Sequence, residues 1–74
     1  MVMKKETIGE NAGVVWRMLL YKGSRATMEE IMDSTGLNAL DASAAIGWLA
    51  REDKVQFFHE NEEDYFDIAR EMYY

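Results

Sequence analysis

The stretch from Gly36 to Val55, which reads GLNALDASAAIGWLAREDKV, constrains the fold more than any other part of the chain. Its apolar residues recur at positions i, i+3, i+4 and i+7, the spacing that buries one narrow face of a helix. These residues are Ala42, Ala45, Ile46 and Leu49. Asn38 is a favourable N-cap, and the Asp41 carboxylate in the first turn suits the helix dipole. The stretch therefore predicts an amphipathic helix over about residues 39–52.

A shorter helix precedes this one, over about residues 28–35. The segment from Thr27 to Glu30 reads TMEE, a capping box in which Glu stands three residues after Thr. Gly36 is placed to end the helix. The side chains that we expect it to bury are Met28, Ile31 and Met32. Two short helices joined by a three-residue turn that contains Gly are typical of a helix-turn-helix motif.

The first helix is predicted over about residues 9–22, with Glu10 or Asn11 as its cap and Gly23 as its end. One face has apolar residues at helical spacing, namely Ala12, Val15, Trp16, Leu19 and Leu20. Three more residues widen this apolar arc, namely Val14, Met18 and Tyr21. We therefore expect this helix to be buried on two sides. The link that follows, residues 24–26, could form a minimal strand.

A β-hairpin is predicted over about residues 55–68. The segments VQFFH and DYFDI, at residues 55–59 and 64–68, have the composition of strands. Pairing Phe57 with Phe66 places Val55 and Ile68 on the same face, and it places Phe58 opposite Tyr65 on the other face. The tail at residues 70–74 could extend the second strand or contact a partner.

Two connections could close this hairpin. A two-residue turn at Asn61 and Glu62 would require positive φ at Glu62 and would place Glu60 opposite Glu63. Because both features are unfavourable, we expect a four-residue loop over residues 60–63. The acidic residues around His59 are expected to form a solvated turn, since their spacing matches no Ca²⁺ loop.

Charge is unevenly distributed along the chain. The net charge is −6. Residues 1–37 contain five basic and five acidic residues, whereas residues 38–74 contain three basic and nine acidic residues. All of the excess negative charge thus lies in the half that contains the third helix and the hairpin. Such a field repels a polyanion.

Composition narrows the classes of function. The chain has no Cys, which removes thiolate metal sites and Cys nucleophiles, and its single His has no nucleophile beside it in the sequence. No apolar run approaches about 18 residues, the length that spans a membrane. The N-terminal segment has no apolar core typical of a secretory signal. We therefore expect a cytoplasmic protein with no enzymatic activity, no cofactor, no metal and no membrane contact.

The order helix, helix-turn-helix, hairpin resembles the winged helix-turn-helix superfamily. The residues that match its general pattern are Gly36, Leu37, Asn38, Ala42, Ile46, Leu49 and Val55. More narrowly, ENAGVVW at residues 10–16 and GWLAREDK at residues 47–54 resemble a family of small, uncharacterised bacterial winged helix-turn-helix proteins. The resemblance implies a single α+β domain over residues 1–74, with a three-helix core and a C-terminal hairpin wing. It also implies the superfamily's commonest function, DNA binding in transcription.

The residues of the third helix fit that function poorly. Its outward positions contain no basic residue, and the expected tip of the wing is acidic. If DNA binds, the candidate contacts are the basic residues around the motif and two polar residues of the third helix. These candidates are Arg17, Lys22, Arg25, Asn38, Ser43, Arg51 and Lys54. The alternative for the basic residues is ordinary surface charge, balanced by neighbouring acidic residues.

A second hypothesis is a protein-interaction module, with a homodimer as one form. A strip of small residues beside Trp48 would suit close packing against another protein. The candidate interface residues are Leu40, Ala44, Gly47, Trp48, Phe58 and Tyr65. Two alternatives stay open. Trp48 could instead fold against the first helix or under the wing, and the Phe58–Tyr65 pair could simply stabilise the hairpin.

Overall fold

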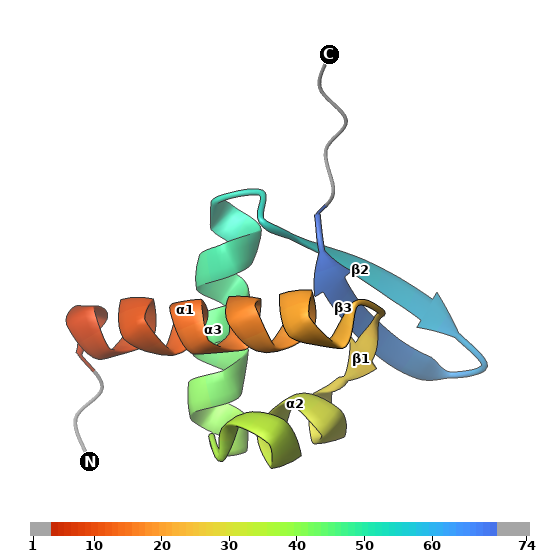
Figure 1. The fold of residues 1–74 in the computed structure, drawn as a ribbon, viewed down its shortest axis with the longest axis horizontal. Coiled ribbons are helices and arrows are strands. Elements are labelled where there is room, and N and C mark those ends of the chain that lie inside the picture. The colour runs from red at the N-terminus through yellow and green to blue at the C-terminus, as the bar shows by residue number, and fades with distance from the viewer. Residues whose placement is uncertain (1–3, 70–74) are drawn as a thin grey trace.

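The computed structural model describes residues 4–69 as three helices and a three-stranded antiparallel sheet (Figure 1). The elements are α1 (Lys5–Lys22), β1 (Ala26–Thr27), α2 (Met28–Thr35), α3 (Ala39–Arg51), β2 (Val55–Glu60) and β3 (Glu63–Ile68). The β2–β3 hairpin projects from the helices as a wing (Figure 1). This is an α+β winged helix-turn-helix fold, as the sequence predicted. The tail at residues 70–74 lies outside the described residues.

The capping box of α2 and the glycines that end α1 and α2 act as predicted. In the capping box of α2, the Glu30 amide donates to Thr27 Oγ1 over 3.1 Å, and the Thr27 amide donates to Glu30 Oε1 over 2.9 Å. Gly23 and Gly36 end α1 and α2 in the left-handed region, with φ of 75° and 78°. Glycine is the residue that adopts this conformation without steric cost.

α1 begins at Lys5, four residues before the expected start, so neither Glu10 nor Asn11 is its cap. The residue before it, Lys4, is extended and makes no side-chain capping bond. The first turn closes through the backbone, since the Ile8 amide donates to the Lys4 carbonyl over 3.0 Å. A helix start that lacks a capping side chain leaves no signal in the sequence.

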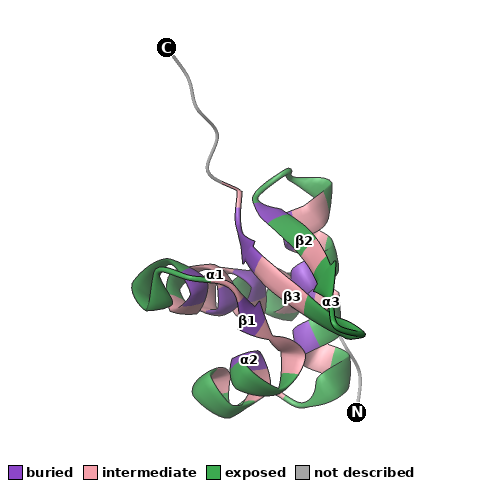
Figure 2. Cartoon of the chain, turned by 90° about the vertical axis from the view of Figure 1, so that its right-hand side faces the viewer, coloured by how far each residue is buried: buried purple, intermediate pink, exposed green. Residues whose placement is uncertain are grey.

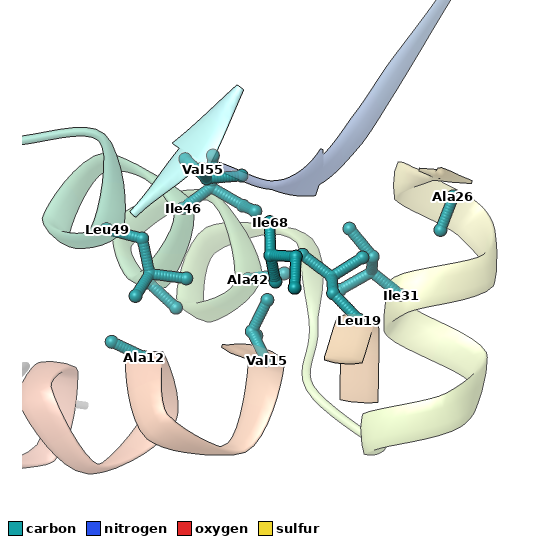
Figure 3. Close-up of a cluster of buried hydrophobic side chains, with 11 residues drawn as sticks. Ala12, Val15, Leu19, Ala26, Ile31, Ala42, Ile46, Leu49, Val55 and Ile68 are labelled. Carbon is teal, nitrogen blue, oxygen red and sulfur yellow. The ribbon is translucent and has the colours of Figure 1, made fainter. Parts of the chain in front are cut away.

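The core lies where α1, α2 and α3 meet the base of the hairpin (Figure 3). Its helical members are Ala12, Val15, Leu19, Ile31, Ala42, Ala45, Ile46 and Leu49. The sheet adds Ala26, Val55 and Ile68. The four apolar positions predicted for α3 are thus all buried. Met28 and Met32 are half-buried and pack against this core beside the fully buried Ile31.

The expectation that α1 is buried on two sides was wrong. Tyr21 is 95% exposed and Leu20 is 47% exposed. Only one stripe of α1, through Ala12, Val15 and Leu19, is fully buried. The reason is geometric, because α2 has only eight residues and the sheet covers the same side of α1 as α3 does (Figure 2). Of the residues that widen the arc, Tyr21 is exposed, whereas Val14 is half-buried and Met18 is half-buried against the core.

The predicted register of the hairpin is confirmed, with Val55 opposite Ile68, Phe57 opposite Phe66 and Phe58 opposite Tyr65. The expected four-residue loop was wrong. Glu60 lies opposite Glu63, and a two-residue turn joins them.

The turn residues Asn61 and Glu62 both have positive φ, 54° and 64°. Such turns follow the right-handed twist of the strands, and this favourable twist offsets the strain at Glu62. An ion pair between Glu60 and Arg25 reduces the repulsion between Glu60 and Glu63.

β1 makes β3 the central strand of the sheet. Ala26 lies opposite Phe66 and Thr27 lies opposite Tyr65, so the minimal strand begins at the last residue of the expected link. The strand order is β1-β3-β2. One edge of β2 therefore has no neighbour among the described strands.

The one-sided burial of α1 predicts different costs for two neighbouring substitutions. Leu19 is fully buried, so Leu19→Ala should lower the free energy of unfolding by ~2–5 kcal/mol through lost burial and a cavity. Leu20→Ala is the matched control, and it should cost less than about 1 kcal/mol. Urea unfolding followed by circular dichroism measures both. Equal costs would mean that both sides of α1 are buried.

Candidate functional site

The outward side of α3 forms a small uncharged surface, which we call the α3 outer face: Leu40, Ser43, Ala44 and Gly47. Leu40 is 62% exposed, Ser43 and Gly47 are exposed, and Ala44 is half-buried. A Cβ placed on Gly47 would meet nothing within 4 Å, so the space above this residue is open. The face follows from the core, because burying Ile46 and Leu49 turns these four positions outward.

Asn38 stands at the start of this face, where it caps α3. Its Oδ1 accepts the Asp41 amide over 2.8 Å, as the sequence predicted. The cap uses the oxygen of the side chain and leaves its NH₂ group as a donor. Asn38 and Ser43 are thus the two exposed polar candidates at this end of α3.

Arg25, a candidate DNA contact, lies over the wing instead of beside α3. Its guanidinium is 4.4 Å from the ring centre of Tyr65 and 5.5 Å from that of Phe58, a cation–π arrangement. It also donates to Glu60 Oε1. We call these four residues the wing cluster. Two candidate interface residues, Phe58 and Tyr65, are therefore half-buried beneath an arginine and separate from the α3 outer face.

The wing cluster changes the titration of its charged members. The hydrogen bond from Arg25, together with its positive charge, lowers the pKa of the Glu60 carboxyl from its ordinary value. The same hydrogen bond and the Glu60 charge raise the pKa of Arg25. Both groups remain ionised near neutral pH, so a phosphate would have to compete with Glu60 for Arg25.

The other basic candidates are dispersed. Lys22 Nζ lies 3.9 Å from Glu30, and Lys54 Nζ lies 3.5 Å from Glu52. Arg17, on α1, and Arg51, at the end of α3, are exposed and form no ion pair within residues 4–69. Exposed ion pairs are weak, so these lysines could exchange partners. Of the four, Arg51 lies one turn after Gly47 and continues the stripe of the α3 outer face at the end of the helix, whereas the other three lie elsewhere.

The tip of the wing is acidic. Its exposed carboxylates belong to Glu60, Glu62, Glu63 and Asp64. His59 Nδ1 lies 2.6 Å from Asp64 Oδ1, so one acid is paired with the single histidine. Within residues 4–69, no group of three or more His, Asp or Glu side chains is arranged to hold a metal ion. In the same range, no helix combines the length and apolar character needed to cross a membrane.

Trp48 packs against α1, one of the two alternatives that the sequence left open. A Cβ on Gly9 would come within 3.3 Å of the indole ring, so any larger residue would push the ring back by a few tenths of an ångström. Trp48 is half-buried beside an open groove of about 340 Å³ between α1 and α3. Trp16 and Gly13 also line this groove. Trp48 is therefore half-buried against α1 and lies one turn after Ala44, at the margin of the α3 outer face.

One exposed residue was missed by sequence reasoning. Phe57 is 56% exposed, although its alternation with Val55 placed it on the core-facing side of the hairpin. Its ring meets Phe66 edge to face, with centres 5.5 Å apart. Burial falls from the base of the hairpin to its tip (Figure 2), so a side chain on the inner face can still lie beyond the core. The sequence signal that could have identified Phe57 as exposed is its position in the hairpin, two residues beyond Val55 toward the tip.

Comparison with known proteins adds three findings. The family model described as "Winged helix-turn-helix domain (DUF2582)" matches residues 3–68. The chain is 43% identical over 49 residues to the uncharacterized protein MJ1608 of Methanocaldococcus jannaschii, a match that covers 65% of this chain and 70% of that protein.

The third finding is structural. The solution NMR structure of protein BT2368 from Bacteroides thetaiotaomicron is similar, with a TM-score of 0.79 and 32% identity. The match covers 89% of this chain and 79% of that one. The similar proteins thus come from a bacterium and from an archaeon, whereas the resemblance in the sequence pointed only to bacterial proteins.

The wing cluster predicts a measurable pKa change. In Arg25→Gln, the pKa of Glu60 should rise toward its ordinary value, because the donor and the positive charge are both lost. An NMR pH titration of the Glu60 side chain measures this. The depressed pKa favours the fold above the ordinary carboxyl pKa, and this contribution is lost as pH falls through the folded-state pKa. Lys22→Gln is the control and should leave Glu60 unchanged.

Proposed function

The chain belongs to the winged helix-turn-helix family whose model matches residues 3–68. We propose that it binds a protein partner through the α3 outer face and does not read duplex DNA. Winged helix domains typically act by binding, to DNA or to proteins, and not by catalysis. The choice between these two kinds of partner depends on the charge of the surface that α3 presents.

A single observation carries the proposal: the four residues of the α3 outer face are uncharged and Leu40 is exposed among them, while the tip of the wing is acidic. A helix that enters the major groove needs cations around it to neutralise several phosphates. Here Arg25 is held by Glu60 on the wing. Arg51 is the one cation within α3, and it lies in the last turn.

The same face has the features of a helix-docking surface. Leu40, Ala44 and Gly47 follow the i, i+4, i+7 spacing of one helical stripe. Small residues at two of these positions allow a close approach, and Leu40 offers an apolar anchor. The net charge of −6 favours a partner with basic residues. We infer that the partner presents an amphipathic helix with basic flanks.

DNA binding in transcription is the second candidate, favoured by the fold and by the exposed donors of Asn38 and Ser43. In that case Arg17, Lys22, Arg51 and Lys54 would have to supply the phosphate contacts. Non-specific binding would then depend steeply on salt, because each phosphate contact releases counterions.

Fluorescence anisotropy with labelled random duplex DNA separates the two candidates. We expect no binding at low salt up to roughly 100 μM protein, the weak end of non-specific affinities. A variant with Ser43→Arg and Gly47→Lys, both at exposed positions, should gain binding that falls with salt. The matched control has Ser43→Glu and Gly47→Glu. Salt-sensitive binding by the unmodified protein would overturn the proposal and establish the DNA role.

The docking proposal has a positive test in NMR titration with a model amphipathic helix built of Leu and Lys. We expect chemical-shift changes on the α3 outer face, and at least about tenfold weaker binding for Leu40→Glu. Leu20→Glu is the matched control, because Leu20 is an exposed leucine on α1, and it should bind as the unmodified protein does. Shifts confined to the wing tip, or equal effects of both variants, would mean that the contact is only electrostatic.

A further inference from the structure

The outer edge of β2 offers backbone groups to a further strand. Sheet order β1-β3-β2 leaves this edge without a neighbour among the described residues. Soluble proteins usually protect such an edge with charges, proline or a bulge. β2 reads VQFFHE, has no proline and has one charged residue at its far end, Glu60. The edge is therefore competent to pair.

The hydrogen-bond pattern of the hairpin identifies the groups that point outward. The Ala69 amide donates to the Lys54 carbonyl over 2.9 Å, so Lys54 belongs to a hydrogen-bonded pair. Hydrogen-bonded and non-bonded pairs alternate along an antiparallel ladder. Residues 56, 58 and 60 thus also bond to β3, and the amides and carbonyls of Val55, Phe57 and His59 face the free edge.

We propose that this edge pairs with the same edge of a second copy, antiparallel, with Phe57 at the two-fold axis. Such a pairing makes one continuous six-stranded sheet from two three-stranded ones. The interface is isologous, the usual geometry of a symmetric dimer. It goes beyond the proposed function, because it involves the β2 edge and not the α3 outer face.

The register follows from counting along the strand. With Phe57 opposite Phe57 of the partner subunit, Val55 lies opposite His59 of the partner subunit, and the reverse pair follows by symmetry. All three outward residues of each copy then lie in hydrogen-bonded pairs. Moving the register by two residues in either direction leaves one outward residue of each copy opposite a turn. The Phe57-centred register alone uses the whole edge.

Side chains support the same register. Phe57 is 56% exposed in one copy, and in the dimer it would pack against Phe57 of the partner subunit. Aromatic cross-strand pairs of this kind stabilise a sheet. Lys54 lies opposite Glu60 of the partner subunit, which places opposite charges together twice in each dimer. The edge is thus complementary to itself in backbone, apolar contact and charge.

Net charge sets how the association should depend on salt. Each copy has a net charge of −6, so two copies repel at long range. Salt screens this repulsion. It also screens the two Lys54–Glu60 pairs, but exposed pairs contribute little, and backbone pairing and the phenylalanine contact are little affected. The dimer should therefore tighten as salt rises. A complex of the α3 outer face with a basic helix should weaken under the same change.

Sedimentation velocity over a range of protein concentrations tests the association. We expect the unmodified protein to shift from monomer toward dimer, and to do so at lower protein concentration in high salt. Phe57→Lys should raise the dimer dissociation constant at least about tenfold, because it places two ammonium groups face to face. Leu20→Lys is the control and should sediment unchanged. A monomer up to about 1 mM, the weak end of specific affinities, overturns the proposal.

Cysteine cross-linking tests the register, and the chain has no cysteine of its own to interfere. Phe57→Cys should form a covalent dimer under mild oxidation, because opposite Cα atoms in a ladder are within disulfide range. Gln56→Cys should not, since it lies opposite Phe58 of the partner subunit. Cross-linking through residue 56 instead would disprove this register. Failure of the dimer leaves the helix titration of the α3 outer face unaffected, so the two proposals fail separately.

Discussion

Close packing between α1 and α3 is the contact on which the rest of the structure depends. Small side chains make it close: Ala12 is 2% exposed, and Ala42 and Ala45 are fully buried. Gly9 adds a notch that receives the ring of Trp48. Because Ile46 and Leu49 must face this contact, the opposite side of α3 is fixed as its exposed face. The surface proposed for binding is thus a direct consequence of the core.

Local patterns in the sequence predicted most of the fold. The caps at Thr27 and Asn38 and the register of the hairpin depend on residues close in sequence, and the structure confirms them. The predictions were wrong where burial or turn type depends on what packs around a segment and not on its own residues. The exposure of Leu20 is set by how little covers α1, and the tight turn at Asn61 is tolerated because the strands twist.

The candidate site was predictable in composition but not in arrangement. An α3 with one cation, Arg51 in its last turn, and an acidic wing tip could be read from the sequence alone. The position of Arg25 could not, because β1 brings it beside Phe58 and Tyr65, more than thirty residues away in the chain. The free edge of β2 could not be predicted either, because it depends on β1 pairing with β3 and making β3 the central strand. Contacts between distant segments leave no local periodicity to recognise.

The central place of β3 has a consequence for how the domain folds. β1 precedes its partner strand by nearly forty residues, and Ile68, near the end of β3, completes the core. Neither outer strand touches the other, so the sheet cannot form before β3 is available. During synthesis on a ribosome, the helices can associate early, but the sheet must wait until residue 68 has left the exit tunnel. Closure of the fold is thus a late and cooperative event, limited by its longest-range pairing.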